Sequence, residues 1–201
     1  MSTELELINA MLAAVGSNGV TSTVGRHPAL IKALPILNRT NTQLQTYGHW
    51  FNTDKGLTLR PDASGEFIVP QTTLRADTTN KALPYVRRGR RMYDPHNQTY
   101  DLAETTLDID VVLQLDYNML PFSAWDAIRA KAVWHMLISA EADQITLQAA
   151  KDDVTETKMF FERERRSQYD TTLRDNPEYA YIMAGLPRSQ SRSSNPRFLG
   201  G

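Results

Sequence analysis

Residues 44–62 constrain the fold most, because helical patterning changes to β patterning within them. Before this stretch, apolar residues recur at helical spacing, and after it they alternate as in a strand. Gly48 accepts a positive φ, so it predicts the end of a helix. The chain is then expected to extend from Trp50, turn tightly at 54–56 and return along 57–59 as a hairpin. Nothing in the stretch can act as a nucleophile, so it predicts fold and not chemistry.

Two helices are predicted before this junction. Thr3 is a suitable N-cap for the first, which we expect to end at Gly16. The second is expected to begin near Pro28, a residue suited to a first helical turn, and to run as far as Gly48. Pro35 interrupts the second pattern, and we expect it either to kink the helix or to mark its true start.

Residues 49–115 have a β pattern. We predict a short strand at 67–69, a polar loop at 71–83 and a hairpin that turns at Gly89. The strongest strand pattern is 107–115, where apolar and acidic residues alternate.

The chain after residue 116 returns to helical patterning. A third helix is predicted to follow Pro121, and we expect it to be the most buried. Its predicted apolar side contains Phe122, Trp125, Ile128, Ala132 and Met136. A fourth helix is predicted from about residue 150 to 173, with only a thin apolar edge.

These patterns predict an α+β fold, in which an antiparallel bundle of about four helices carries a β-sheet insertion between its second and third helices, with a flexible C-terminal tail. We expect residues 1–48 and 119–186 to form the helical bundle, 49–118 the β insertion and 187–201 the tail.

Composition excludes several classes of function. The chain has 201 residues, a formal net charge of −1 and no cysteine. Without cysteine it has no disulfide, thiol nucleophile or Cys-ligated metal. Its net charge is too small to attract nucleic acid or a membrane surface through overall electrostatics. The acidic N-terminus does not resemble a signal peptide, and no apolar run approaches the roughly 20 residues that span a bilayer. We expect a soluble protein without membrane insertion, used without export.

Asp108 and Asp110 are the one carboxylate pair with a possible chemistry. Alternation places them on one face of a strand, about 7 Å apart, and paired carboxylates can hydrolyse glycosides. The alternation is equally that of a half-buried strand with a solvated face, which we favour. The four histidines do not stand at metal-ligand spacing. We therefore expect no catalytic residue, no metal and no cofactor.

Two segments carry concentrated positive charge. The densest cluster contains Arg87, Arg88, Arg90 and Arg91, with Tyr85 and Tyr93 beside it. Basic residues with aromatic neighbours can bind nucleic acid. The alternatives are a solvated hairpin tip and a surface that docks on an acidic protein neighbour, and the low net charge of the chain favours the protein neighbour. The run 163–166 has nearby Glu162 and predicts a helix face lined with ion pairs.

The tail combines spaced arginines, Arg188, Arg192 and Arg197, with an apolar Phe198 near its end. Such a segment suits folding onto a partner, and it is equally compatible with an ordinary disordered terminus.

Several short patterns follow one another along most of the chain. They are Ile36-Leu37-Asn38-Arg39-x-Asn41-x-x-Leu44-Gln45-x-x-Gly48, Trp50-x-Asn52, Thr58-Leu59-x-Pro61-Asp62, Val86-x-Arg88-Gly89-x-x-x-Tyr93-Asp94, Val111-Val112, Leu120-Pro121, and Ile128 with Lys131 and Ala132. In this order they resemble the tail tubular protein A family, the tail adaptors of autographivirus-type short-tailed phages.

The resemblance implies a non-enzymatic virion protein, made in the host cytoplasm and assembled in the tail. It implies a homo-oligomeric dodecamer ring that joins the portal protein to the nozzle, tail tubular protein B, and helps anchor tail fibres. DNA would pass through its channel without specific binding. Portal contacts are expected at Arg163, Arg166, Arg188, Arg192, Arg197 and Phe198, and nozzle or fibre contacts at Arg87, Arg88, Arg90 and Arg91. The alternative function is a tail-associated glycan hydrolase that acts on the host envelope.

Overall fold

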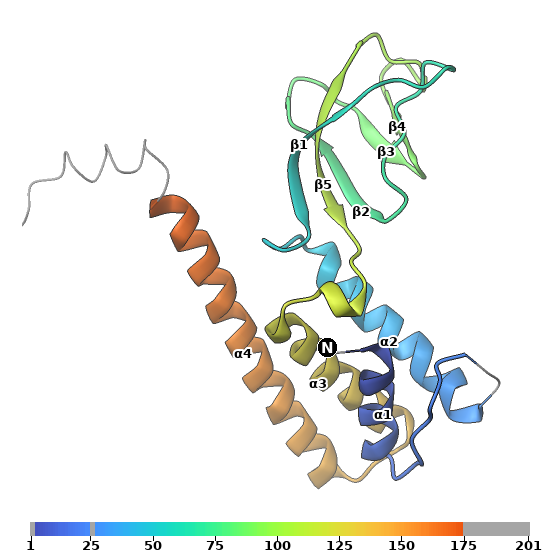
Figure 1. The fold of residues 1–201 in the computed structure, drawn as a ribbon, viewed down its shortest axis with the longest axis vertical. Helices are drawn as coiled ribbons and strands as arrows, with labels where there is room; N and C mark the ends of the chain where they lie inside the picture. Colours follow the sequence, from blue (N-terminus) through green and yellow to red (C-terminus); the bar gives the residue numbers. More distant parts are fainter. Residues whose placement is uncertain (1–2, 25–26, 175–201) are drawn as a thin grey trace, which may run out of the picture. The chain divides into compact units, whose positions relative to one another are not determined.

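A computed structural model describes residues 3–24 and 27–174, with side chains as far as Tyr169. The chain forms two compact units, Met1–Arg165 and Arg166–Gly201, so the last residues of the fourth helix belong to the second unit. The elements in order are α1 (Glu4–Ala14), α2 (Pro28–Thr46), β1 (Thr53–Leu59), β2 (Thr73–Thr78), β3 (Val86–Arg88), β4 (Arg91–Tyr93), β5 (Leu107–Leu113), a 3-10 turn η1 (Tyr117–Met119), α3 (Phe122–Ser139) and α4 (Gln144–Arg174) (Figure 1). The predicted class, four helices with a sheet between the second and third, is confirmed.

The starts of α1 and α2 follow the local sequence rules. The Thr3 hydroxyl accepts from the Glu6 N–H at 3.3 Å, and the Glu6 carboxylate accepts from the Thr3 N–H at 2.7 Å, which is a capping box. Pro28 occupies the first turn of α2. Pro35 lies inside α2 rather than at its start, so the second of the two expectations for this proline is wrong.

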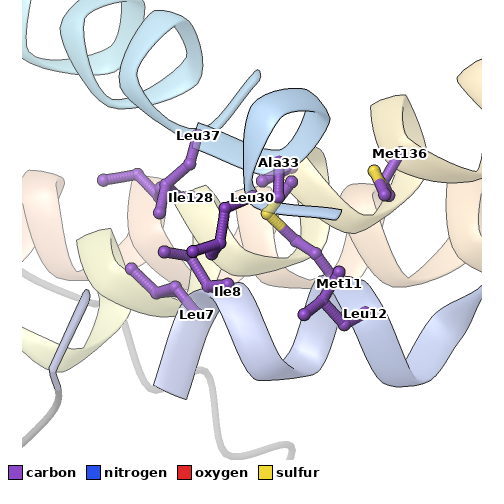
Figure 2. Packing of buried hydrophobic residues seen from close by; sticks show 10 residues of the cluster. Leu7, Ile8, Met11, Leu12, Leu30, Ala33, Leu37, Ile128 and Met136 are labelled. Carbon is purple, nitrogen blue, oxygen red and sulfur yellow. The ribbon is translucent and has the colours of Figure 1, made fainter. Parts of the chain in front are cut away.

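The helical core joins α1, α2 and α3. Its buried members are Leu7, Ile8, Met11, Leu12, Leu30, Ala33, Leu37, Ile128, Ala132 and Met136. Figure 2 shows Leu7, Ile8, Met11 and Leu12 of α1 beside Leu30, Ala33 and Leu37 of α2, with Ile128 and Met136 of α3. Burial of these side chains fixes the three helices as one body.

The sheet is antiparallel with the order β1-β5-β2-β3-β4, which places β5 between β1 and β2. Its own core lies under β5 and contains Phe67, Met92, Leu107, Ile109 and Val111, all essentially inaccessible to solvent. The predicted alternation in β5 is confirmed, because Leu107, Ile109 and Val111 are buried while Asp108 is exposed. The hairpin that turns at Gly89 is also confirmed, with Gly89 at φ +64° between β3 and β4.

The tight turn predicted at 54–56 is wrong. β1 continues through these residues, and Asp54 pairs with Val111 while Leu57 pairs with Ile109, so the extra residues form a bulge. Gly56 has φ +67°, a conformation that glycine supplies in one type of β-bulge as well as in a hairpin turn. The expected extension from Trp50 is also wrong, since residues 50–52 form a turn before β1.

The remaining corrections concern short polar segments. The predicted loop 71–83 contains β2, whose alternating burial was missed among its polar residues. The predicted strand 67–69 makes isolated bridges only, Pro61 with Phe67 and Ile68 with Arg91.

The third helix is confirmed after Pro121 and has more buried residues than α1 or α2, but Phe122 is 64% exposed, not on the buried side.

The fourth helix begins at Gln144, earlier than predicted, because Asp143 caps it. The carboxylate of Asp143 accepts hydrogen bonds from the hydroxyl and the N–H of Thr146, which lower its pKa.

The predicted tail 187–201, with Arg188, Arg192, Arg197 and Phe198, lies outside the described residues. The boundaries proposed for the helical part and the β insertion stay predictions.

Candidate assembly surfaces

The junction between α2 and the sheet is a buried polar network. The Gln45 side chain, fully inaccessible to solvent, donates to the Leu115 carbonyl at 3.0 Å and accepts from the Leu115 N–H at 2.8 Å. It also donates to Asn41 at 2.7 Å. Asn52 donates to the main-chain carbonyls of Gln45 and Leu113 at 2.9 and 2.8 Å. These bonds connect the end of α2 to the end of β5, so the helical part cannot shift relative to the sheet without breaking them.

An aromatic cluster attaches α4 to this junction. The His49 ring stacks on Phe51 at 5.5 Å and meets the edge of Phe161 at 4.9 Å, and Trp50 lies 5.6 Å from Phe161 between ring centroids. His49 Nε2 lies 2.9 Å from the Leu44 carbonyl, which identifies Nε2 as the protonated nitrogen. Burial lowers the pKa of His49, since the charged imidazolium would lose its hydration there.

The inward side of α4 is narrow. Among its described side chains only Thr157 and Phe161 are buried. An ion pair adds a second attachment, because Arg129 of α3 contacts Asp126 at 2.7 Å and Asp153 of α4 at 3.3 Å. The predicted thin apolar edge is confirmed at Phe161, and most of the described side chains of this helix are exposed to solvent.

The outward side of α4 carries a depression that we call the α4 stripe. It is lined by Asp152, Thr155, Glu156, Met159, Phe160 and Arg163. Their spacing places them along one side of the helix, opposite Thr157 and Phe161. Met159 is 54% exposed and Phe160 is 52% exposed. Large apolar side chains on a solvent-facing helix surface are typical of a protein contact.

The arginines around Gly89 have different roles. Arg87 donates to the carbonyls of Thr73 and Leu74 at 2.7 and 2.8 Å, so it holds the hairpin against β2. Arg88 lies over the Tyr93 ring at 3.6 Å. These contacts occupy the two guanidinium groups inside the subunit.

Arg91 is also engaged, because it pairs with Glu66 at 2.7 Å and lies over the Tyr100 ring at 4.2 Å. Arg90 is exposed, and within the described part of the chain its side chain has no hydrogen bond, ion pair or ring contact. Of the four arginines that the sequence grouped together, Arg90 is therefore the one whose guanidinium group makes no contact within the described part of the chain.

Asp108 and Asp110 lie on the exposed face of β5, as predicted, and their carboxylates bond to neighbouring strands. Asp108 accepts from the Thr58 hydroxyl at 2.6 Å. Asp110 accepts from the Gly56 N–H at 2.9 Å and from the Thr79 hydroxyl at 3.3 Å. These are the cross-strand contacts of a polar sheet face, and they match the interpretation favoured from the sequence.

The arginines of α4, metal binding and membrane-spanning helices remain to be compared with the structure. Arg163 and Arg166 are both exposed on α4, while Arg165 pairs with Glu162 at 3.5 Å, which confirms an ion pair on this helix. Across residues 3–24 and 27–174, no group of three His, Asp or Glu side chains could hold a metal ion. No helix in this part of the chain combines the length and apolar character needed to cross a membrane.

The polar network at Gln45 and Asn52 was not predicted. One signal was available, because Asn41 falls on the apolar side of the second helix and a polar residue there requires a partner. The partner of Asn41 is Gln45 of the same helix. Gln45 in turn bonds to Leu115, which follows β5 and lies 70 residues later in the chain, so local sequence could not identify the network.

Comparison with known proteins identifies the family. A family model described as tail tubular protein matches residues 5–174. Tail tubular protein A of Klebsiella phage KP34 is 31% identical over 121 residues, a match that covers 59% of this chain and 62% of that relative. Less than two thirds of the relative's length is therefore spanned. Because the family match covers most of the chain, the chain belongs to the tail tubular protein family and is a structural protein of the phage virion tail.

Proposed function

We propose that this protein is the adaptor ring between the portal and the tail nozzle, a dodecamer that works by assembly and has no enzymatic activity. Tail fibres attach near the same joint, and DNA leaves through the central channel without specific binding. The proposal takes its partners from the resemblance to tail tubular protein A, and the family match supports the structural role.

The observation that carries the proposal is the exposure of α4. This helix is attached to its own subunit through Phe161, Thr157 and the Arg129–Asp153 pair, and its opposite side exposes Met159 and Phe160. An enzyme built around a cleft has no need of such a surface, whereas a subunit of an assembly needs surfaces that its neighbours complete.

Charge supports passage of DNA. With a net charge of −1, the subunit lacks the excess of lysine and arginine that holds phosphates tightly. Weak attraction suits a channel through which a genome must move rapidly, because each neutralised phosphate would slow release.

We assign portal contacts to Arg163 and Arg166 of α4, which are exposed, and to Arg188, Arg192, Arg197 and Phe198 of the C-terminal segment. We assign nozzle or fibre contacts to the hairpin at Gly89. Within that hairpin Arg90 is the leading contact residue, while Arg87, Arg88 and Arg91 keep its shape through their internal contacts.

The test is co-assembly with the portal ring of the same phage, measured as particle mass by light scattering after size-exclusion chromatography. We expect a stable particle with about twelve copies of this chain per portal, a count that comes from symmetry and from the resemblance. A chain truncated before residue 187 should bind the portal more weakly, and the matched control Arg90→Ala should bind it normally. A persistent monomer that ignores the portal would contradict the proposal.

A further inference from the structure

A second exposed surface lies on α2 and α3, and we call it the outer α2–α3 face. Its α3 members are Lys131, Trp134, His135 and Ile138, and its α2 members are Lys32 and Arg39. The α3 members recur at three- and four-residue spacing, which places them along one side of that helix.

Two observations place the helices of this face together. The Lys131 ammonium lies 3.3 Å from the Gln43 side chain of α2, one turn from Arg39. Burial lowers the pKa of His135, and the charges of Lys131 and Arg39 lower it further, so both cations act on one imidazole.

The positive charge of this face has no ion-pair partner in the part of the chain that the structure describes. The ion pairs found among the described residues involve none of Lys32, Arg39, Lys131 or His135. The face is also partly apolar, since Ile138 is 46% exposed and Trp134 is only half-buried. An uncompensated basic patch with apolar side chains suits an acidic protein surface that carries apolar groups of its own.

The α4 stripe has that complementary character. Asp152 and Glu156 lie on it beside the exposed Met159 and Phe160. Within the described part of the chain neither acid has an ion-pair partner, and Asp152 accepts only a hydrogen bond from the Gln148 amide at 2.8 Å. One chain therefore carries an acidic apolar strip and a basic apolar face.

We propose that the α4 stripe of one copy docks on the outer α2–α3 face of a second copy, so that Asp152 and Glu156 meet its cations while Met159 and Phe160 cover Trp134 and Ile138. The stripe cannot reach the face of its own subunit. The side of α4 that carries Asp153, Thr157 and Phe161 already lies on that subunit, and the centre of the stripe is about a third of a turn away around the helix.

A contact between two different surfaces of identical chains is heterologous, and repetition of such a contact generates a ring when the rotation closes. An isologous pair of stripes would instead end at a dimer. The inference rests on the proposed function, because it supplies the subunit contact that the adaptor ring needs. Arg163 is the last residue of the stripe and Arg166 follows it along α4, so both lie beyond the four side chains that make this contact and stay available to the portal.

Cross-linking between defined positions tests this contact, and the absence of native cysteine makes every introduced thiol unique. Met159→Cys marks the stripe and Ile138→Cys marks the face, both at positions that are about half exposed. The full-length variants carry one or both substitutions, and each is treated with a short bismaleimide and resolved on a denaturing gel. Each is treated alone and after mixing with the portal ring.

The double variant should give a ladder of covalent oligomers, because each subunit offers one thiol to each neighbour. Either single variant should remain monomeric, and a mixture of the two singles should stop at a dimer. A dimer from Met159→Cys alone would show stripe against stripe and would overturn the proposal. A product of Met159→Cys with the portal, or the absence of any ladder in both conditions, would overturn it as well.

The same samples separate the two proposals. Particles that contain the portal but give no ladder would keep the adaptor function and refute this interface. A ladder without portal binding would keep the interface and refute the adaptor function.

Discussion

Replacement of Gln45 by methionine should destabilise the whole subunit, because the network at Gln45 is the principal polar connection between α2 and the sheet. Methionine keeps the length and approximate volume of the side chain but removes its hydrogen bonds. The Leu115 N–H, the Leu115 carbonyl and the Asn41 side chain would then lose their partners.

Each buried polar group left without a partner costs about 1–3 kcal/mol. Asn41 is only 2% exposed, whereas Leu115 is half-buried and its backbone can recover part of the loss from water. We therefore expect Gln45→Met to lower the free energy of unfolding by about 2–4 kcal/mol. For a chain of this size, that loss corresponds to a fall in Tm of roughly 4–16 °C.

Urea unfolding followed by circular dichroism measures the loss, with Gln43→Met as the matched control. Gln43 is exposed on the same helix, and its side chain accepts one hydrogen bond, from Lys131, among the described residues, so its replacement should change stability by less than about 0.5 kcal/mol. A loss below about 1 kcal/mol for Gln45→Met would refute the reasoning, because it would show that water reaches the junction.

Three further predictions concern the junction and α4. Replacement of Phe161, which is 4% exposed, by alanine should cost about 3–5 kcal/mol in urea unfolding, whereas Phe160→Ala, at a position 52% exposed, should cost less than about 1 kcal/mol. Gly48→Ala should cost at least about 2 kcal/mol, because Gly48 has φ +76° and a Cβ there would lie 3.0 Å from Val112. The control Gly16→Ala has a similar φ of +68° but open space around it, so by the same measurement it should cost only about 1 kcal/mol. The pKa of His49 is lowered in the folded protein. As the pH falls below about 6.5, the unfolded chain therefore binds more protons than the folded chain, and the free energy of unfolding decreases as the pH falls. His49→Gln should therefore lose less unfolding free energy than the wild type between about pH 7 and pH 5, and an equal loss would contradict this assignment.

The sequence predicted the helices well because their signals are local. A capping box at Thr3, a proline at the first turn of α2 and a turn before α3 each require only neighbouring residues. The strand β5 was predicted for the same reason, since its alternation of aliphatic and acidic residues can be recognised without information from elsewhere in the chain.

Errors arose where one local signal fits two structures. Asp54–Gly56 has the composition of a hairpin turn, yet β5 supplies a partner for residues on both sides of it, and the segment becomes a bulge. The strand β2 is polar, and its pairing with β5 determines its structure. Phe122 has the helical spacing of a core residue but stands at the first turn of α3, where it is 64% exposed.

For the candidate surfaces as well, the sequence identified which residues lie together, and the structure was needed to find their contacts. The sequence identified the arginines around Gly89 as one basic cluster, and the structure shows that Thr73, Tyr93 and Glu66 engage three of them. Composition could not separate Arg90 from its neighbours, because the partners of the others lie on other strands or loops.

By itself the sequence determined the α+β class, the order of helices and sheet, and the absence of thiol chemistry, because periodicity, capping and composition act within a few residues. The order of its short motifs also indicated the tail tubular protein family. Only the tertiary structure decided which polar residues join α2 to β5, which arginine remains available, and which side of α4 faces solvent. Each of these depends on contacts between residues distant in the chain, and their geometry exists only after the core has packed.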